Sequence, residues 1–530
     1  MDTVADTPAP PPGSPEQRAL ALRAWIGFVA MVFGNFMAIL DIQIVASSLN
    51  QIQAGLSASA EELTWVQTSY LIAEVIAIPL SGYLSRLLST RVYFVMSALG
   101  FTLASLACAF AWNIESMVVF RALQGFLGGG MIPTTFAAMF MVFPPERRTV
   151  PLVSLGLVST LAPALGPTIG GYLTDAFSWH WLFLVNLIPG LLVALVVWNL
   201  VHIDQPDWSL ARRIDFIGLA LMAMFLGSLE YVLDEGPRHD WLEDDTVRPL
   251  FFVAIVAGAL FFWRSLTHKE PIVDLRVFRN RNFAAGAVVA FVVGVMLYGI
   301  VYLVPLFFGT VRGYSSLQIG HVMMVTGIAM FLTAPLAGQA QKRLDLRIML
   351  AWGLFAVALG TWLNANLTAQ SSLDQFLLPQ LLRGHGFMFC MVSMTGLALG
   401  TLPPEDIKNG SGLFNLMRNL GGAIGLAVIN TMLSRLQSMH WSHLAETVNL
   451  SRTPVREAAI AATGTLSPML GTDAQPAAVG IFARRVAQQA LVMTFNDLLL
   501  ILAILVASLA LLLPLIEKPR APPGAEGGAH

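Results

Sequence analysis

Fourteen apolar stretches divide the chain, and each is long enough to cross a lipid bilayer. A transmembrane helix needs about 20 predominantly apolar residues, and most gaps between the stretches hold the charged residues, Pro and Gly that interrupt helices. Because irregular backbone cannot face lipid, each span is expected to be helical. The pattern predicts an all-α integral membrane protein with 14 transmembrane helices, at residues 25–46, 63–83, 92–111, 115–140, 150–173, 180–202, 214–234, 249–267, 283–309, 317–338, 347–366, 375–400, 411–436 and 492–516.

The composition leaves too little polar surface for a soluble fold. Charged residues make up 12% of the chain and hydrophobic residues 56%, whereas a soluble domain carries about 25% charged residues. The net charge of −2 gives no reason to expect a nucleic-acid partner. The two chain ends, 1–23 and 517–530, are rich in Pro and Ala and are predicted to be disordered tails.

Lys and Arg lie mainly in every second loop, and this bias predicts the orientation in the membrane. An even number of spans places both chain ends on one side, and the short loops on the opposite side hold only Arg238, Arg248 and Arg312. Both tails are therefore predicted to be cytoplasmic. The one long connection, residues 437–490, is predicted to be a mostly polar extracytoplasmic loop. The basic residues on the cytoplasmic side are Arg86, Arg91, Arg147, Arg148, Arg212, Arg213, Lys269, Arg276, Arg279, Arg281, Lys342, Arg343, Arg347 and Lys408.

Two pairs of similar segments indicate an internal repeat. Residues 79–82 read Pro-Leu-Ser-Gly and residues 335–338 read Pro-Leu-Ala-Gly, and each leads into a basic cluster. Residues 143–146 and 402–405 share Pro-Pro-Glu after an apolar residue, at nearly the same separation along the chain. Parallel repeats with a binding site between them are typical of transporters. The predicted units are an N-terminal six-helix bundle (24–203), an inserted helix pair (204–270) and a C-terminal six-helix bundle (271–516).

Two carboxylates lie inside predicted spans, where a charge costs about 2.5–3.5 kcal/mol on insertion scales. Asp41 lies near the outer end of the first span, and Glu74 lies in the middle of the second span among apolar neighbours. A carboxyl group in an apolar cavity can take up and release a proton, so both are candidates for proton coupling. The alternatives are a solvated helix-end cap for Asp41 and a structural hydrogen bond between helices for Glu74.

Three further charged residues lie at the ends of predicted spans. Arg121, near the outer start of the fourth span, either extends to the membrane interface or provides a fixed charge beside a carboxylate. Glu230 and Asp234 end the seventh span, in the inserted pair. Because that helix should flank the core, we interpret these two acids as interfacial.

The second half has its own polar candidates. Arg383 is expected to be interior, or to be the counter-ion of an acid in the other half. A lone histidine such as His385 is more often a hydrogen-bonded structural residue than a titrating one. Asn415 and Arg418 are further cavity candidates on the thirteenth span.

The chain lacks the motifs of an enzyme or an ATP-driven pump. It contains no His-x-x-x-His run, no Gly-x-Ser-x-Gly and no phosphate-binding Gly-x-x-x-x-Gly-Lys loop. Its two cysteines, Cys108 and Cys390, lie in separate apolar stretches and are predicted to be buried thiols. We therefore expect no metal and no cofactor.

Three short motifs lie at characteristic places in the chain: Gly82, Arg86 and Arg91 in the first cytoplasmic loop, Arg121, Gln124 and Gly125 in the fourth span, and Gly166, Pro167, Gly170 and Gly171 in the fifth span. With these motifs, the chain between about residues 25 and 516 resembles the major facilitator superfamily, in particular its fourteen-helix drug:proton antiporters of the EmrB/QacA type, in which the helix-five motif marks antiporters. The loop motif at 82–91 departs from the family pattern at Arg86, where many members have Asp.

The resemblance implies a secondary active transporter that exports small amphipathic compounds in exchange for protons by alternating access. An exporter of one physiological metabolite, such as a fatty acid, a siderophore or a bile salt, is an alternative that the sequence leaves open. EmrB-like members work with a periplasmic adaptor protein and an outer-membrane channel, so the resemblance also implies these partners and a place in the bacterial inner membrane. The segment 437–490 is the candidate docking site for the adaptor.

Overall fold

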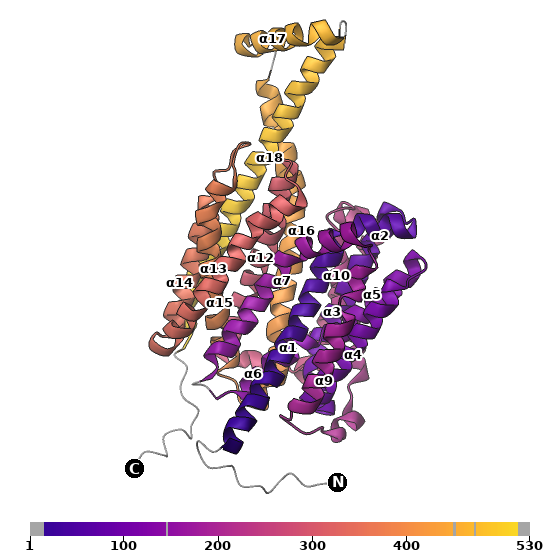
Figure 1. Cartoon of the computed structure of the whole chain (residues 1–530), viewed down its shortest axis with the longest axis vertical. Helices are drawn as coiled ribbons and strands as arrows, with labels where there is room; N and C mark the ends of the chain where they lie inside the picture. Colours follow the sequence, from indigo (N-terminus) through magenta and orange to yellow (C-terminus); the bar gives the residue numbers. More distant parts are fainter. Residues whose placement is uncertain (1–14, 145–146, 449–451, 471–472, 518–530) are drawn as a thin grey trace.

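The computed structural model describes residues 15–144, 147–448, 452–470 and 473–517, and its regular structure within these ranges is helical (Figure 1). The helices of the first half are α1 (Pro15–Ser47), α2 (Leu49–Leu56), α3 (Ala60–Leu88), α4 (Thr90–Ala109), α5 (Ile114–Gly128), α6 (Met131–Val142), α7 (Thr149–Ala176), α8 (Trp181–Leu184) and α9 (Leu187–Leu200). The inserted helices are α10 (Phe216–Glu235) and α11 (Val247–Thr267). The helices of the second half are α12 (Arg281–Thr310), α13 (Ser316–Arg343), α14 (Leu346–Leu363), α15 (Leu373–Leu399), α16 (Ile407–Thr447), α17 (Thr453–Leu470) and α18 (Ala474–Ser508).

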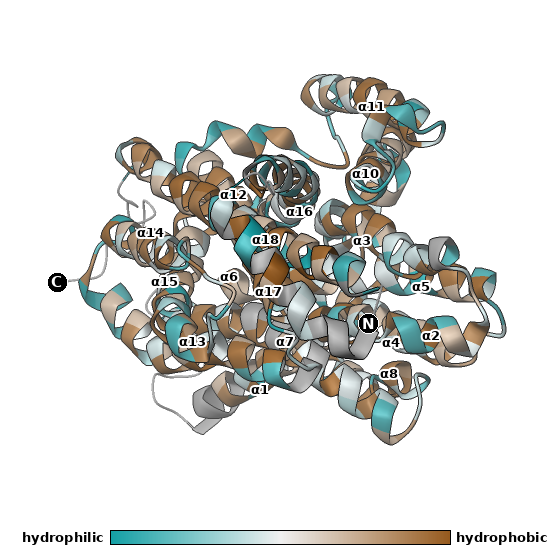
Figure 2. Ribbon diagram, turned by 90° about the horizontal axis from the view of Figure 1, so that it is seen from above, coloured by the Kyte–Doolittle hydropathy of each residue, from teal (hydrophilic) through white to brown (hydrophobic). Residues whose placement is uncertain are grey.

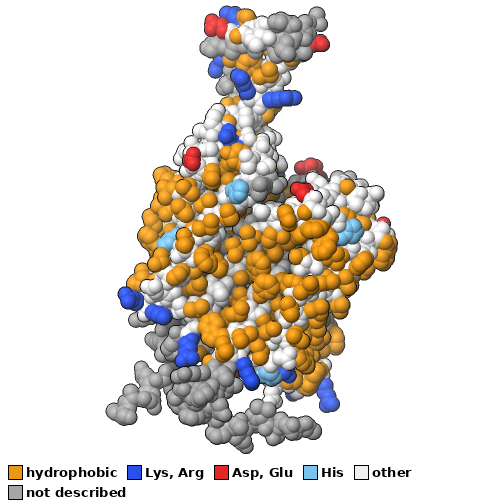
Figure 3. Space-filling model, in the orientation of Figure 1, with side chains coloured by type: hydrophobic (Ala, Val, Ile, Leu, Met, Phe, Trp, Pro, Cys, Tyr) orange, Lys and Arg blue, Asp and Glu red, His pale blue; other side chains and the backbone are white. Residues whose placement is uncertain are grey.

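Twelve helical segments of the described chain are long and apolar enough to cross a membrane, and each coincides with a predicted stretch. Helices α7 and α15, of 28 and 27 residues, occupy the other two predicted stretches. Exposed apolar side chains form a broad belt across the face of the molecule that Figure 3 shows. Such a continuous apolar surface is typical of a protein that lies in a membrane.

A matched pair of close contacts supports the internal repeat. Gly125 of α5 lies against the backbone carbonyl of Tyr70 in α3, and Gly384 of α15 lies against the backbone carbonyl of Thr326 in α13. Tyr70 and Thr326 are as far apart along the chain as the two Pro-Leu-Ser/Ala-Gly segments are. Small residues permit such close helix approach in membranes. The two halves therefore use equivalent positions for equivalent helix contacts.

The inserted helices α10 and α11 lie at one side of the bundle, where α11 packs on the outside of α10 (Figure 2). Helix α10 contacts α3 from the first half and α16 from the second half. Beyond the end of α10, Trp241 Nε1 donates a 3.1 Å hydrogen bond to Thr431 Oγ1 of α16. The insertion thus bridges the two halves.

The two halves meet at the end of the bundle where the described chain begins and ends, here called the terminal end, and they diverge toward the other end (Figure 1). At the meeting point, Ser411 Oγ of α16 donates a 2.6 Å hydrogen bond to the carbonyl oxygen of Pro133 in α6. Nearby, the ring centres of Phe136 and Phe414 lie 6.4 Å apart. The bundle is therefore closed at its terminal end.

The segment 437–490, which the sequence predicts to be a loop, is mostly helical in its described part. Helix α16 runs for 41 residues and α18 for 35 residues, with α17 between them. At 1.5 Å per residue, α16 is about 60 Å long, twice the about 30 Å thickness of the hydrocarbon core. The two helices continue past the apolar belt as a projection (Figure 1). We call this projection the stalk; it comprises residues 435–447, α17 and residues 474–489.

Candidate functional site

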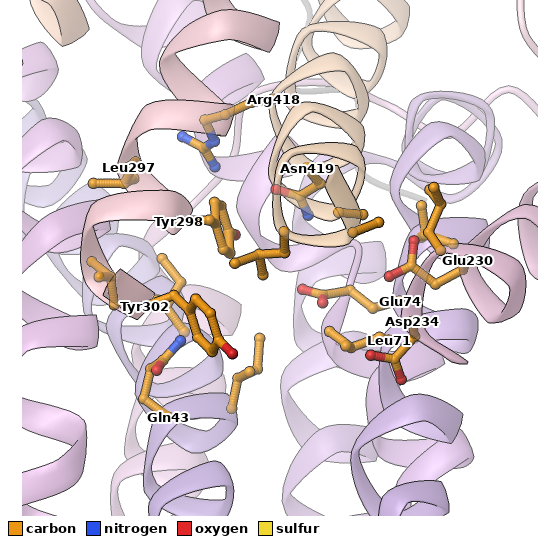
Figure 4. Close-up of a pocket in the computed structure, with 18 of the residues that line it drawn as sticks. Gln43, Leu71, Glu74, Glu230, Asp234, Leu297, Tyr298, Tyr302, Arg418 and Asn419 are labelled. Carbon is orange, nitrogen blue, oxygen red and sulfur yellow. The ribbon is translucent and has the colours of Figure 1, made fainter. Parts of the chain in front are cut away.

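A cavity of about 260 Å³ lies between the two halves, beside the inserted helix α10. Its walls come from α1, α3, α10, α12 and α16, with one residue from α6 and Arg238 from the turn after α10. Most of its surface is apolar, which suits an organic ligand held by a few polar groups. The polar residues that line it are Gln43, Glu74, Glu230, Asp234, Arg238, Tyr298, Tyr302, Arg418, Asn419 and Asn430 (Figure 4).

Three carboxylates line one wall of the cavity (Figure 4). Glu74 of α3 is 5% exposed, and Glu230 of α10 is 7% exposed. Asp234, one turn after Glu230, accepts a hydrogen bond from Thr68 Oγ1 of α3. The wall therefore gathers acids from the first half and from the insertion, so the inserted helix takes part in the cavity.

The interpretation of Glu230 as an interfacial residue is wrong. Glu230 shares the buried face of α10 with Met222 and Leu226, and that face packs toward α3 and α16. Asp234 is partly exposed and is held by Thr68. In the sequence, Met222, Leu226 and Glu230 recur at four-residue intervals and so share one helix face, but the sequence does not show what that face packs against.

The opposite wall of the cavity carries aromatic rings and one guanidinium. Tyr298 and Tyr302 of α12 project into the space, and Arg418 of α16 lies near Tyr298 (Figure 4). The Arg418 guanidinium carbon lies 5.9 Å from the centre of the Phe136 ring. Asn415, one turn earlier in α16, is buried and donates a 2.9 Å hydrogen bond to its own helix. Arg418 therefore belongs to the cavity, whereas Asn415 is not among its lining residues.

A second charged site lies in the first half, away from the cavity lining. Arg121 Nη1 of α5 lies 2.6 Å from Asp41 Oδ2 of α1, and both side chains are 0% exposed. Gln124 Nε2 donates to Asp41 Oδ1 at 3.0 Å, and Asn186 Nδ2 donates to the same oxygen at 2.7 Å. The Arg121 guanidinium carbon also lies 4.2 Å from the centre of the Tyr70 ring. A charge network therefore joins four segments of this half, including the helix-four motif.

The burial of this pair decides between the alternatives that the sequence left open. Asp41 lies inside α1, which continues to Ser47, so it is no solvated helix-end cap. Arg121 does not extend to the membrane interface, because it bonds to Asp41 instead. The two candidate acids have different environments: three side chains donate to Asp41, whereas no described residue donates a hydrogen bond to the Glu74 carboxylate.

Helix α7 approaches α1 closely through the glycines of the helix-five motif. At Gly166, a Cβ would collide with Gln43, and at Gly170 it would collide with backbone and hydroxyl atoms of α1. Around Gly171 there is open space, so this position permits substitution. Pro167 lies within α7. Two of the three motif glycines are thus required by helix packing.

The first loop motif lies at the closed end, where the halves contact each other. A Cβ on Gly82 would lie 2.9 Å from the carbonyl oxygen of Lys408, at the start of α16. Lys408 Nζ donates a 2.9 Å hydrogen bond to the carbonyl of Ser85 and forms an ion pair with Asp204. Asp204 also accepts the backbone N–H of Thr90 at 3.0 Å. We call Gly82, Ser85, Asp204 and Lys408 the gate cluster.

The two arginines of the loop motif lie beside the gate cluster. The Arg86 guanidinium carbon lies 5.8 Å from the centre of the Tyr83 ring, and Arg91 Nη1 lies 2.6 Å from His202 Nε2. This motif carries Arg at position 86, and Asp204, from the connection after α9, provides an acid beside it. Sequence reasoning missed Asp204 because it lies outside the motif.

The second half contains a buried guanidinium that lacks a counter-ion. Arg383 of α15 is 0% exposed, and its three guanidinium nitrogens have no hydrogen-bond partner in the described chain. The expectation that it is interior agrees with this burial, but the expected acid from the other half is not in contact with it. By contrast, His385 accepts a 2.9 Å hydrogen bond from Trp352 Nε1 and has a second partner in Thr333. His385 therefore has the environment of a structural histidine.

Replacing Arg383 with methionine is expected to raise the melting temperature by several degrees. A buried charge without a partner costs several kcal/mol relative to an apolar side chain of similar length. Thermal unfolding of the purified protein in detergent measures the change, with His385→Gln as a control that should lower the melting temperature. A lower melting temperature for Arg383→Met would show that the guanidinium has a stabilising partner.

Comparison with known proteins gives consistent matches over nearly the whole chain. The family model described as Major Facilitator Superfamily matches residues 31–426. The chain is 50% identical over 506 residues to the "Colistin resistance protein EmrB" of Acinetobacter baumannii, which covers 95% of this chain and 98% of that protein. It is 30% identical over 504 residues to the "Multidrug export protein EmrB" of Escherichia coli K12, with 95% and 97% covered.

Two further matches extend the range of similar proteins. The "Fatty acid resistance protein FarB" of Neisseria gonorrhoeae is 30% identical over 512 residues, with 96% of this chain and 98% of that protein covered. Among solved structures, the proton:xylose symporter XylE is similar with a TM-score of 0.58 and 12% identity, over 94% of this chain and 97% of that protein. The likeness to XylE concerns the fold alone.

Proposed function

The chain belongs to the Major Facilitator Superfamily and is an EmrB-type efflux transporter, and from this premise we propose that it exports small amphipathic drugs in exchange for protons. The observation that carries the proton exchange is the environment of Glu74. Its carboxylate lies in an apolar cavity between the two halves, without a hydrogen-bond donor from the described residues. Such an intramembrane acid is suited to bind a proton and a substrate in turn.

The closed terminal end gives this structure a place in the proposed cycle. If the termini are cytoplasmic, the gate cluster shuts the cytoplasmic side and the structure is outward-facing. In this state, substrate leaves the cavity and Glu74 takes up a proton from outside. After the halves rearrange, Glu74 releases the proton to the cytoplasm and substrate binds.

In this proposal, the Asp41–Arg121 pair acts differently from Glu74. It fixes a carboxylate and a guanidinium inside the first half, and two charge-assisted bonds, from Arg121 and from Gln124 to Asp41, join α5 to α1. A rearrangement that separates the pair would free Asp41 to take up a proton. Asp41 is therefore the second candidate for proton coupling.

The names of the relatives indicate a range of cargo. They refer to resistance to colistin, to multidrug export and to resistance to fatty acids. Multidrug export by proton antiport is the function that this range favours. The export of one physiological metabolite, such as a fatty acid, a siderophore or a bile salt, is the second candidate, and Arg418 in the cavity wall favours a cargo that carries a carboxylate.

We also propose the arrangement in the membrane. Helices α7 and α15 complete fourteen spans, both termini lie in the cytoplasm of a bacterium, and the stalk extends into the periplasm. The stalk exposes apolar side chains beyond the lipid-facing belt, among them Trp441 (47% exposed) and Ile460 (66% exposed). Aromatic and aliphatic groups of this kind suit a protein interface. A periplasmic adaptor that leads to an outer-membrane channel is the partner that this surface fits.

Uptake of a fluorescent organic cation into inverted membrane vesicles tests the proposed function. With an imposed pH gradient, the wild type should accumulate the cation, and Glu74→Gln should reduce the gradient-driven rate at least about tenfold because the amide cannot carry the proton. Glu243→Gln, which changes an exposed acid in the loop after α10, should transport at the wild-type rate.

Two other results would change the proposal. Full gradient-driven uptake by Glu74→Gln would assign proton coupling to Asp41 instead. No gradient-driven uptake of any cationic drug by the wild type would contradict multidrug antiport and favour the physiological cargo.

A further inference from the structure

We propose that the inserted helix α10 contributes a second cation-binding carboxylate, Glu230, to the transport cavity, so that Glu74 and Glu230 together bind the charged group of an amphipathic organic cation. This inference rests on the export function proposed above and names the substrate class of the same cavity. It assigns the inserted helices a direct part in binding.

The first argument is that both carboxylates are buried and have no partner. Glu74 is 5% exposed and Glu230 is 7% exposed, and both line the cavity (Figure 4). No described residue donates a hydrogen bond to either carboxylate or forms an ion pair with it. Buried carboxylates are costly unless a cation or hydrogen-bond donors compensate them. Two acids that face one cavity without such groups therefore indicate a ligand that supplies positive charge.

The second argument is that the other charged groups of the cavity are already engaged or lie on the opposite wall. Asp234 accepts the hydrogen bond of Thr68, and Arg238 Nη1 lies 3.1 Å from Glu235, which is not a lining residue. Arg418 lies across the cavity, beside Tyr298 (Figure 4). The wall formed by α3 and α10 thus presents two carboxyl groups that no described residue pairs, and a ligand can bind to them.

The third argument concerns the shape of a suitable ligand. Tyr298 and Tyr302 face the acidic wall across an otherwise apolar space (Figure 4). Aromatic faces attract organic cations when water is excluded. Two carboxylates in one cavity repel each other when both are charged, and a cation between them relieves this repulsion. A flat aromatic cation, with its charge toward α3 and α10 and its ring toward α12, satisfies all three features.

Equilibrium binding of N-methyl-4-phenylpyridinium to the purified full-length chain in detergent tests the proposal without any proton gradient. Glu230→Gln should weaken binding at least about tenfold, the loss expected when one charge partner of an organic cation is removed from a buried site. Asp215→Asn provides the matched control, because Asp215 is a buried acid at the other end of α10 that pairs with Arg264. Its affinity should equal that of the wild type.

The neutral isostere 4-methylbiphenyl separates charge recognition from packing. Its binding should be the same in the wild type and in Glu230→Gln. In the wild type, N-methyl-4-phenylpyridinium should also protect Glu230 from carbodiimide modification, as measured by peptide mass spectrometry, and this readout needs no variant to fold.

Each contrary result has a defined meaning. Wild-type affinity in Glu230→Gln, equal losses in Glu230→Gln and Asp215→Asn, absent binding by the wild type, or absent protection of Glu230 would each overturn the proposal. Intact cation binding together with absent gradient-driven transport would leave the site supported and would contradict only the proton antiport proposed above.

Discussion

Arg121→Ala is expected to lower the free energy of unfolding by about 3–5 kcal/mol, the cost of removing one partner of a buried ion pair. The substitution leaves the Asp41 carboxylate at 0% exposure without its counter-charge, and only Gln124 and Asn186 still donate to it. It also removes the cation that lies over the Tyr70 ring. Because these contacts join α1, α3 and α5, we expect transport to fall strongly while the protein still inserts into the membrane.

A double-mutant cycle measures this effect in mixed detergent micelles, with unfolding followed by tryptophan fluorescence. Asp41→Asn combined with Arg121→Ala should cost less than the sum of the two single changes, because no charge is then left unpaired. Arg213→Ala is the control: the Arg213–Glu270 pair is 60% and 45% exposed, and such pairs contribute about 0–1 kcal/mol. Additive costs in the cycle, or normal transport by Arg121→Ala, would show that the pair is not coupled.

The hydrophobic pattern predicted the spans well because the membrane imposes one strong requirement on them. A span must be apolar over about 20 residues, and that property is local to each stretch. The stalk was missed because its helices meet no such requirement. Residues 435–447 and 474–489 mix Ala, Gln, Ser and Arg with apolar residues. They continue the membrane-spanning parts of α16 and α18, and hydropathy alone does not show where such a helix ends.

The candidate residues could be selected from the sequence, but their partners could not. Charge inside an apolar run selects Asp41, Glu74 and Arg121 without knowledge of the fold. The pairing of Asp41 with Arg121 joins residues 80 positions apart, so it depends on how helices pack. Glu230 was misplaced for the same reason: the sequence shows that α10 is apolar, but it does not show that α10 lies against α3 and α16.

Asp204→Asn is expected to open the terminal end of the bundle and, in the proposed cycle, to shift the chain toward the state that is open at this end. The ion pair between Lys408 and Asp204 is only 8% and 13% exposed, and it connects the second half to the connection after α9. Loss of a mostly buried pair costs several kcal/mol, and each 1.4 kcal/mol changes a population ratio about tenfold. If the pair forms only in the closed state, we expect the open population to increase at least about tenfold.

The labelling rate of Ser411→Cys with a membrane-impermeant maleimide in inverted vesicles measures this shift. Ser411 is 0% exposed and bonds to Pro133 across the closed end, so it becomes accessible only when the halves separate there. The native Cys108 and Cys390 are both 0% exposed and should remain unlabelled. Asp207→Asn, which changes an exposed acid of the same connection whose carboxylate bonds to Ser209, should leave the rate unchanged. The comparison is between Ser411→Cys alone and Ser411→Cys combined with Asp204→Asn. Equal labelling rates in these two proteins would mean that the backbone contacts at Gly82, and not the ion pair, hold the terminal end closed.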